Sequence, residues 1–230
     1  METIRIEAVT GASGTWYNHY RCLRYRVFVV EQRWAGLAGA GEPGLTSPDP
    51  VDEHARFWLA WSPGWTLVGA VRVRTVSDVF PHEELFRHHL RRPEVASERP
   101  RMGTLNSLVV DAGWRRRNCL RHGGGSGTVA GHLLSAAVAG CRTAGLRAIV
   151  ATAQTSISAR ALMRAGFRVI DPPVHTSLHP LFPMCNVGVS LNADGDGRAL
   201  HDYFDRRERD VLAGRSIASL FSRAQLAATG

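Results

Sequence analysis

The sequence contains no lysine, so arginine supplies all 28 of its Lys and Arg residues. This absence excludes a Walker A phosphate loop, whose lysine reaches the phosphates. It also excludes Schiff-base and pyridoxal-phosphate catalysis, because both need a lysine amine. The formal net charge of +8 favours a polyanionic partner. Since an arginine-only set is also typical of a GC-rich genome, the charge alone does not predict a nucleic-acid-binding protein.

Cysteines are few, and long apolar runs are absent. The four cysteines show no CxxC or zinc-finger spacing, which predicts reduced thiols in a cytoplasmic protein. No apolar run reaches about 18 residues, and the first residues lack the apolar core of a signal peptide, so we expect no membrane partner. His82, His88 and His89 lack the spacing of a metal site. We therefore expect neither a bound metal nor a permanently bound cofactor.

Hydrophobic periodicity predicts an α/β protein with about seven strands. The 230 residues are 44% hydrophobic, which suffices for a substantial core. Alternating or short apolar segments predict strands at residues 4–9, 57–61, 66–75, 104–110, 148–153, 167–170 and 184–191. Helical spacing predicts helices at 16–30, 83–90, 128–143 and 156–165. We expect one domain over residues 1–192 and a helical extension over residues 193–230.

Two passages in the second half of the chain resemble the GNAT acyltransferase superfamily. Leu108–Asp111 precedes a basic, glycine-rich loop and a helix, like the acyl-donor motif of that superfamily. Ala159–Val169 is similar to its usual passage from a helix into a strand. The predicted order of elements also matches. The resemblance implies a mixed central sheet flanked by helices, and an acyl thioester as donor.

The first third of the chain resembles acyl-homoserine-lactone (autoinducer) synthases and N-acyl amino acid synthases. The similar residues are Arg24, Phe28 and Trp34, followed by Asp49 and Asp52. Further on, Gly69–Arg72 and Asp78–Pro81 are similar to two other segments of the autoinducer synthases. The resemblance implies an acceptor pocket that includes Arg24, Phe28, Trp34, Arg72 and Phe80. The residue types suit that role, because arginine binds carboxylates and carboxylates bind an ammonium or sulfonium group.

The general base of the autoinducer synthases has no counterpart in this sequence. Thr104 and Ser107 stand where that family has its Glu and Arg. Removal of the proton from the acceptor amine then falls to another group. The candidate catalytic residues are Asp49, Asp52, Glu53 and His54, and an ordered water that passes the proton to solvent is the alternative.

The resemblance implies that the acyl donor binds where the fourth and fifth predicted strands diverge. Backbone N–H groups there would polarise the thioester carbonyl, and glycines before a helix would receive phosphate groups. The loop at residues 114–127 is several residues longer than is usual in the superfamily. Thr152 matches a position that lines the acyl chamber in the synthases. The candidate donor-binding residues are Leu108, Val109, Val110, Arg115, Arg116, Arg117, Arg121, Gly124, Gly125, Ser126, Gly127 and Thr152.

The sequence therefore predicts an N-acyltransferase. It would move an acyl group from acyl-CoA or an acyl carrier protein to the amine of a small amino-acid-derived acceptor. An acidic carrier protein would suit the arginine cluster. One alternative is an autoinducer synthase with a relocated base and S-adenosylmethionine as acceptor. The others are a catalytically inactive relative and a basic nucleic-acid-binding module, although no nucleic-acid-binding motif supports the last.

Overall fold

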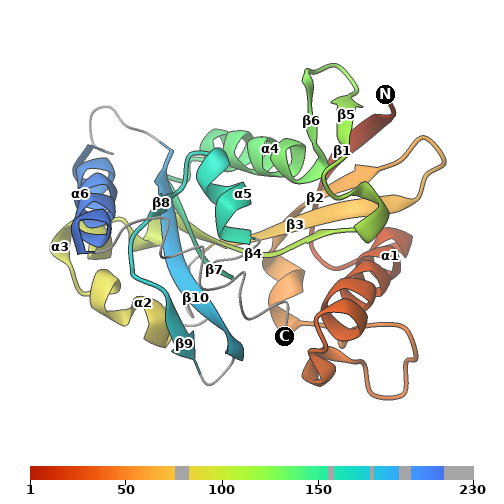
Figure 1. Cartoon of the computed structure of the whole chain (residues 1–230). Helices are drawn as coiled ribbons and strands as arrows, with labels where there is room; N and C mark the ends of the chain where they lie inside the picture. The colour runs from red at the N-terminus through yellow and green to blue at the C-terminus, as the bar shows by residue number, and fades with distance from the viewer. Residues whose placement is uncertain (76–82, 155–157, 177–178, 192–197, 215–230) are drawn as a thin grey trace. The chain divides into compact units, whose positions relative to one another are not determined.

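The computed structural model describes residues 1–75, 83–154, 158–176, 179–191 and 198–214 (Figure 1). The chain forms two compact units. Unit 1 contains Met1–Arg74 and Asn106–Ala139, and unit 2 contains Thr75–Leu105 and the chain from Gly140 onward. Strand β4 (Met102–Val110) passes from unit 2 into unit 1 between Leu105 and Asn106.

The sheet of unit 1 is mostly antiparallel. Its strands are β1 (Thr3–Thr10), β2 (Arg56–Trp61), β3 (Leu67–Thr75), β5 (Asn118–Arg121) and β6 (Ser126–Thr128), together with the second part of β4. They lie in the order β6-β5-β1-β2-β3-β4. Strands β5 and β6 form a hairpin, and β5 pairs in parallel with the start of β1.

Helices cover both faces of this sheet. The helical elements of unit 1 are α1 (Thr15–Arg24), the π-helix η1 (Tyr25–Glu31), the short 3₁₀ helices η2 (Ala35–Leu37), η3 (Pro50–His54) and η5 (Ala112–Trp114), and most of α4 (Val129–Thr143). Helix α1 packs on one face, where Tyr20 and Leu23 join Phe57 and Leu59 of β2 in one hydrophobic cluster. Helix α4 packs on the other face (Figure 1).

Unit 2 is built around β10. Its strands are β7 (Ala148–Gln154), β8 (Arg168–Val169), β9 (Val174–Thr176) and β10 (His179–Ser190), with the first part of β4. Its helices are α2 (Glu83–Leu90), α3 (Pro93–Ala96), η4 (Arg99–Arg101), α5 (Ser158–Arg164) and α6 (Arg198–Gly214). Strands β7, β8 and β9 are antiparallel to β10. Buried side chains of α2, the strands and α6, including Phe86, Val150 and Phe204, form its core.

The mixed α/β architecture confirms the predicted fold class. The described residues form ten strands instead of about seven, because β5, β6 and β9 are too short to show a period in the sequence. The prediction of one continuous loop at residues 114–127 is wrong, since part of it is the β5–β6 hairpin. The division at residues 192 and 193 stays a prediction. Within the described ranges, no helix has the length and apolar character needed to cross a membrane.

Candidate acceptor site

Arg72 and two carboxylates form the centre of the candidate site in unit 1. Asp49 caps η3, where its side chain accepts a hydrogen bond from the backbone N–H of Val51 at 3.2 Å, and Pro50 begins the helix. This turn presents Asp49 and Asp52 to the same guanidinium. Arg72 Nη1 lies 2.7 Å from Asp49 Oδ2 and also donates to Asp52 Oδ1. Asp52 is fully buried, and a buried carboxylate requires partners of this kind.

Two residues that the sequence analysis missed complete the cluster. The Tyr17 hydroxyl of α1 donates to Asp52 Oδ2 at 2.7 Å. Arg72 Nε donates to the Oδ1 atom of Asn106 in β4 at 2.5 Å. No local signal in the sequence indicates these contacts, because each partner lies 34 or 35 residues away along the chain.

Arg24 forms a long ion pair with Asp52, but two of its guanidinium nitrogens make no hydrogen bond. Its side chain is 6% exposed, and Nη1 lies 3.9 Å from Asp52 Oδ2, beyond hydrogen-bond distance. Its Nε and Nη1 atoms are buried without a hydrogen-bond partner, and so is the hydroxyl of Tyr20. The guanidinium lies 5.4 Å from the centre of the Tyr20 ring. Buried donors without acceptors are costly, so this corner of the site suits an anionic ligand group.

Phe28 and Trp34, which follow Arg24 in the sequence, form an aromatic pair. Their rings are stacked, with centroids 5.0 Å apart and an interplanar angle of 5°. The pair depends on the π-helix η1, after which the backbone N–H of Trp34 donates to the carbonyl of Phe28 at 2.8 Å. Phe28 belongs to the hydrophobic cluster that includes Tyr20 and Leu23 of α1, and its side chain is 8% exposed. Trp34 packs against the same cluster. The fifth residue of the predicted pocket, Phe80, lies outside the described residues.

The charges of the cluster fix its protonation states. Burial raises the pKa of Asp49, but the charge and hydrogen bond of Arg72 outweigh this and hold it below its ordinary value. Burial, together with the hydrogen bond to Asp52, raises the pKa of Tyr17 to about 12. Asp49 is therefore ionised at neutral pH and Tyr17 is protonated. An ionised carboxylate paired with arginine is a weak base.

The four predicted catalytic residues occupy different environments. Asp49 and Asp52 lie in the cluster, whereas Glu53 and His54 are exposed at the end of η3. Asp49 has the more accessible of the two clustered carboxylates, since its side chain is 28% exposed. The assignment of a general base among these residues stays a prediction.

The predicted donor-binding residues are divided between the two units. Leu108–Val110, the arginines and the glycines belong to unit 1, and Thr152 belongs to unit 2. The parallel pairing of β4 with β7 covers Met102–Thr104, and Ser107 then has a φ of 55°, an unusual angle for a strand residue other than glycine.

Several of these residues already have protein partners. Arg115 donates to the carbonyl of Val110 at 2.8 Å and pairs with Glu31 at 2.6 Å. Thr152 donates to Asn186 at 3.0 Å. The glycines lie in the turn and second strand of the β5–β6 hairpin, and Thr128 Oγ1 caps α4 by accepting from the N–H of Gly131. Their role toward a donor stays a prediction.

A second polar cluster lies in unit 2 around Asp171. His88 Nε2 and His89 Nε2 lie 3.0 and 2.6 Å from its carboxylate oxygens, and His89 Nδ1 lies 2.5 Å from the hydroxyl of Tyr203. Burial lowers the pKa of His89 more than Asp171 raises it. The neutral ring therefore donates from Nε2 to the carboxylate and accepts from Tyr203.

This second cluster has three ligand atoms within 4.8 Å of one another, a spacing that a metal ion could use. The carboxylate of Asp171 already accepts from Asn186 at 2.7 Å, and it pairs with Arg207 at 3.4 Å. These contacts join α2, β10 and α6 in a hydrogen-bond network and put a guanidinium beside the Asp171 carboxylate. The prediction that the protein holds no metal stays a prediction.

Comparisons with known proteins bear on the fold. No protein-family model matches the sequence, and no curated protein matches it. Among solved structures, the CoA-dependent acyl-homoserine lactone synthase BjaI, solved with MTA, is 18% identical, with a TM-score of 0.60 over 90% of each chain. TofI, solved with an inhibitor and MTA, is 17% identical, with a TM-score of 0.60 over 86% of this chain and 98% of its own.

A further structure resembles the chain more distantly. A Lactobacillus plantarum protein described as an N-acetyltransferase is 14% identical, with a TM-score of 0.51 over 82% of this chain and 99% of its own. At these identities the likeness establishes the fold. The protein therefore has the fold shared by BjaI and the Lactobacillus protein, which confirms at the level of fold the resemblance to autoinducer synthases and GNAT acyltransferases.

Proposed function

We propose that the protein is an N-acyltransferase that acylates the amine of a small acceptor bearing a carboxylate. The carrying observation is the buried Arg24 guanidinium, which has two N–H donors without an acceptor beside the unpartnered hydroxyl of Tyr20. A carboxylate of the acceptor would accept a charge-assisted hydrogen bond from this guanidinium. The fold supports the reaction type, because BjaI is a CoA-dependent acyl-homoserine lactone synthase.

The remaining charges of the site suit the other end of an amino acid. Asp49 is ionised and partly exposed, so it can receive the acceptor's ammonium group. In the reaction, the ammonium group first loses a proton to solvent, and the neutral amine nitrogen then forms a bond to the thioester carbonyl carbon while the carbon–sulfur bond breaks. The thiolate leaves and takes up a proton, while the amine loses one to solvent through water. We assign Asp49 to positioning the amine, because its lowered pKa makes it a weak base.

The identity of the acceptor separates two versions of this proposal. BjaI has been solved with SAM and isopentyl-CoA, so a site on this fold can hold S-adenosylmethionine as the second substrate. We favour an amino acid or related metabolite, because Thr104 and Ser107 replace the Glu and Arg of the autoinducer synthases. A lactone product together with methylthioadenosine would identify the S-adenosylmethionine version.

The donor is proposed as an acyl-CoA or an acyl carrier protein. Arg116 and Arg117 are exposed on the segment before the β5–β6 hairpin, where an acidic carrier protein could dock. Because acyl-CoA and acyl carrier proteins are cytoplasmic, we also propose that the protein is cytoplasmic.

The test is acyl transfer by the purified protein. Acyl-CoA is supplied with an amino acid mixture or with S-adenosylmethionine, and products are identified by mass spectrometry. Arg24→Met should raise the acceptor KM roughly 10- to 100-fold, as expected for the loss of a charge-assisted hydrogen bond. The matched control is Arg26→Met, two residues away, because Arg26 is exposed and pairs with Asp111 at 3.1 Å.

Three results have distinct meanings. An unchanged KM in a folded Arg24→Met variant would remove the acceptor assignment. Equal effects of Arg24→Met and Arg26→Met would show that general charge, and not the buried guanidinium, is responsible. No transfer from either CoA or carrier-protein thioesters to any acceptor would refute the proposed function itself.

A further inference from the structure

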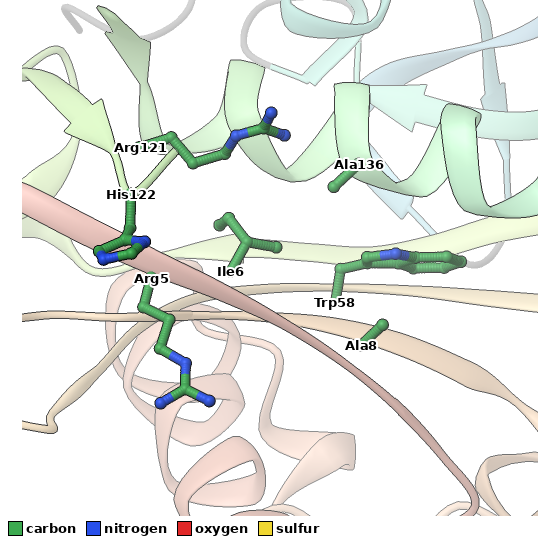
Figure 2. A pocket seen from close by; sticks show the side chains of 7 residues that line it. All are labelled: Arg5, Ile6, Ala8, Trp58, Arg121, His122 and Ala136. Carbon is green, nitrogen blue, oxygen red and sulfur yellow. The ribbon is translucent and has the colours of Figure 1, made fainter. Parts of the chain in front are cut away.

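Unit 1 contains a cavity of about 490 Å³ on the α4 side of its sheet (Figure 2). Its lining comes from β1, β2, α4 and the β5–β6 hairpin, and consists of Arg5, Ile6, Ala8, Trp58, Arg121, His122 and Ala136. No acidic residue is among them. The volume lies within the range of small-molecule sites, which typically combine an apolar surface with a few polar groups.

The strand register separates this cavity from the candidate acceptor site. Side chains alternate between the two faces of a strand, and directly paired residues of antiparallel strands share a face. Ala8 pairs with Trp58, so both lie on the cavity side. Phe57 and Arg72 pair with each other and belong to the opposite face, which carries α1. A ligand in the cavity would therefore not occupy the acceptor site.

Arg121 provides an unused positive charge above the cavity. Among the described residues, its guanidinium has no ion-pair or hydrogen-bond partner. Its Nε would lie 2.6 Å from a Cβ atom at Gly124, so the glycine in the hairpin turn leaves the space in which this side chain lies. Figure 2 shows Arg121 extending over the cavity, whereas the side chain of Arg5 points to the other side of β1. Arg5 lies instead over the ring of Trp65, at 5.2 Å.

Apart from the two arginines and His122, the lining is apolar. Ile6 and Trp58 form the floor and the two alanines leave the space open, with Ala136 pointing down from α4 (Figure 2). From the unpaired cation and this apolar floor, we infer that the cavity binds a small amphipathic carboxylate. The head group pairs with the Arg121 guanidinium, and an aliphatic or aryl body packs on Trp58. The hairpin that lengthens the segment before α4 supplies the cation.

The test uses octanoate as probe and octanamide as its uncharged match, each titrated calorimetrically into the full-length protein. Octanoate should bind at least about 10-fold more tightly than octanamide, as the loss of a charge-assisted hydrogen bond predicts. Arg121→Gln should remove that difference, and the exposed Arg116→Gln, in the same segment, should retain it. Ala136→Leu should abolish binding of both probes by filling the cavity while leaving Arg121 in place.

The Ala136→Leu variant also separates this site from the acyl-transfer reaction. Ala136 is not part of the acceptor site, so acyl transfer should continue at the wild-type rate in this variant while octanoate binding is lost. If octanoate still binds to both the Ala136→Leu and the Arg121→Gln variants, it binds at another site, such as an acyl-chain site, and the inference is overturned. Equal affinity for octanoate and octanamide in the wild type, or no binding of either, would also overturn it.

Discussion

Replacing Arg72 with methionine tests whether the buried charge cluster is organised as described. The substitution keeps most of the aliphatic stem but removes the cation that pairs with Asp49 and Asp52. Breaking a buried ion pair by removing one partner costs roughly 3–5 kcal/mol, because a charge is left without compensation. Tyr17 still donates to Asp52, and Arg24 is 3.9 Å away, so we expect the lower end, about 3 kcal/mol.

The assay is urea denaturation at pH 7, compared with the exposed control Arg26→Met. The pair of Arg26 with Asp111 is 3.1 Å long, but both side chains are at least 30% exposed. Exposed pairs contribute about 1 kcal/mol or less, so the control should differ little from wild type. For Arg72→Met, a loss of about 3 kcal/mol corresponds to a fall in Tm of roughly 6–12 °C in a chain of this size.

Acid provides an independent check with a defined sign. In the wild type the pKa of Asp49 is lowered in the folded state, so this stabilisation is present above its unfolded value of 3.8 and is lost as the pH falls through the folded value. In Arg72→Met, burial is the largest remaining influence and is opposed only by the Val51 hydrogen bond and the charge of Arg24, so the pKa of Asp49 rises in the folded state. The deficit of the variant should then shrink as the pH is lowered from 7 toward 5.

Two results would refute this account of the cluster. One is a loss below about 1 kcal/mol for Arg72→Met, equal to that of an exposed pair. The other is a deficit that grows on acidification. The double variant Arg72→Met/Asp52→Asn should recover part of the loss, because it removes the stranded charge together with the cation.

Two further predictions concern packing and the second cluster. Gly69→Ala should destabilise the protein by roughly 1–3 kcal/mol in thermal unfolding. The added Cβ would lie 2.7 Å from Val129 Cγ1 and 2.9 Å from Leu133 Cδ1, both in α4. An unchanged Tm would show that α4 can shift freely. Asp171→Asn should lower the free energy of unfolding by about 2–4 kcal/mol, because it weakens the hydrogen bond to His89. The control Asp205→Asn, at an exposed ion pair, should lower it by less than about 1 kcal/mol. Similar losses for the two variants would contradict a structural role for the hydrogen bonds around His89.

Local sequence patterns predicted most of the elements, and the resemblance to autoinducer synthases implied part of the candidate site. Arg24 and Phe28 are four residues apart on a helical segment, and Asp49 and Asp52 flank the first turn of a short helix that begins with proline. Spacing of this kind depends only on backbone geometry, so it can be read without knowledge of neighbours. The alternation in β3 likewise placed Arg72 in a strand.

Elements that rely on distant partners were missed for a physical reason. Strand β5 has four residues and is stabilised by its pairing with β1 at the start of the chain, so its own sequence shows no strand period. The π-helix η1 was predicted as ordinary helix, because a wider turn changes the hydrogen-bond pattern without a distinct residue pattern.

The sequence by itself determined the order of helices and strands, the residue types available for acceptor binding and the exclusion of lysine chemistry. Only the tertiary structure decided which charges are satisfied and which are not. Arg72 and Arg24 are equivalent as residue types, yet Arg72 is paired with two carboxylates and Asn106, while Arg24 keeps two buried donors without a partner. That difference arises because hydrogen bonding depends on distances of a few ångströms between segments far apart in the chain, and folding alone sets those distances.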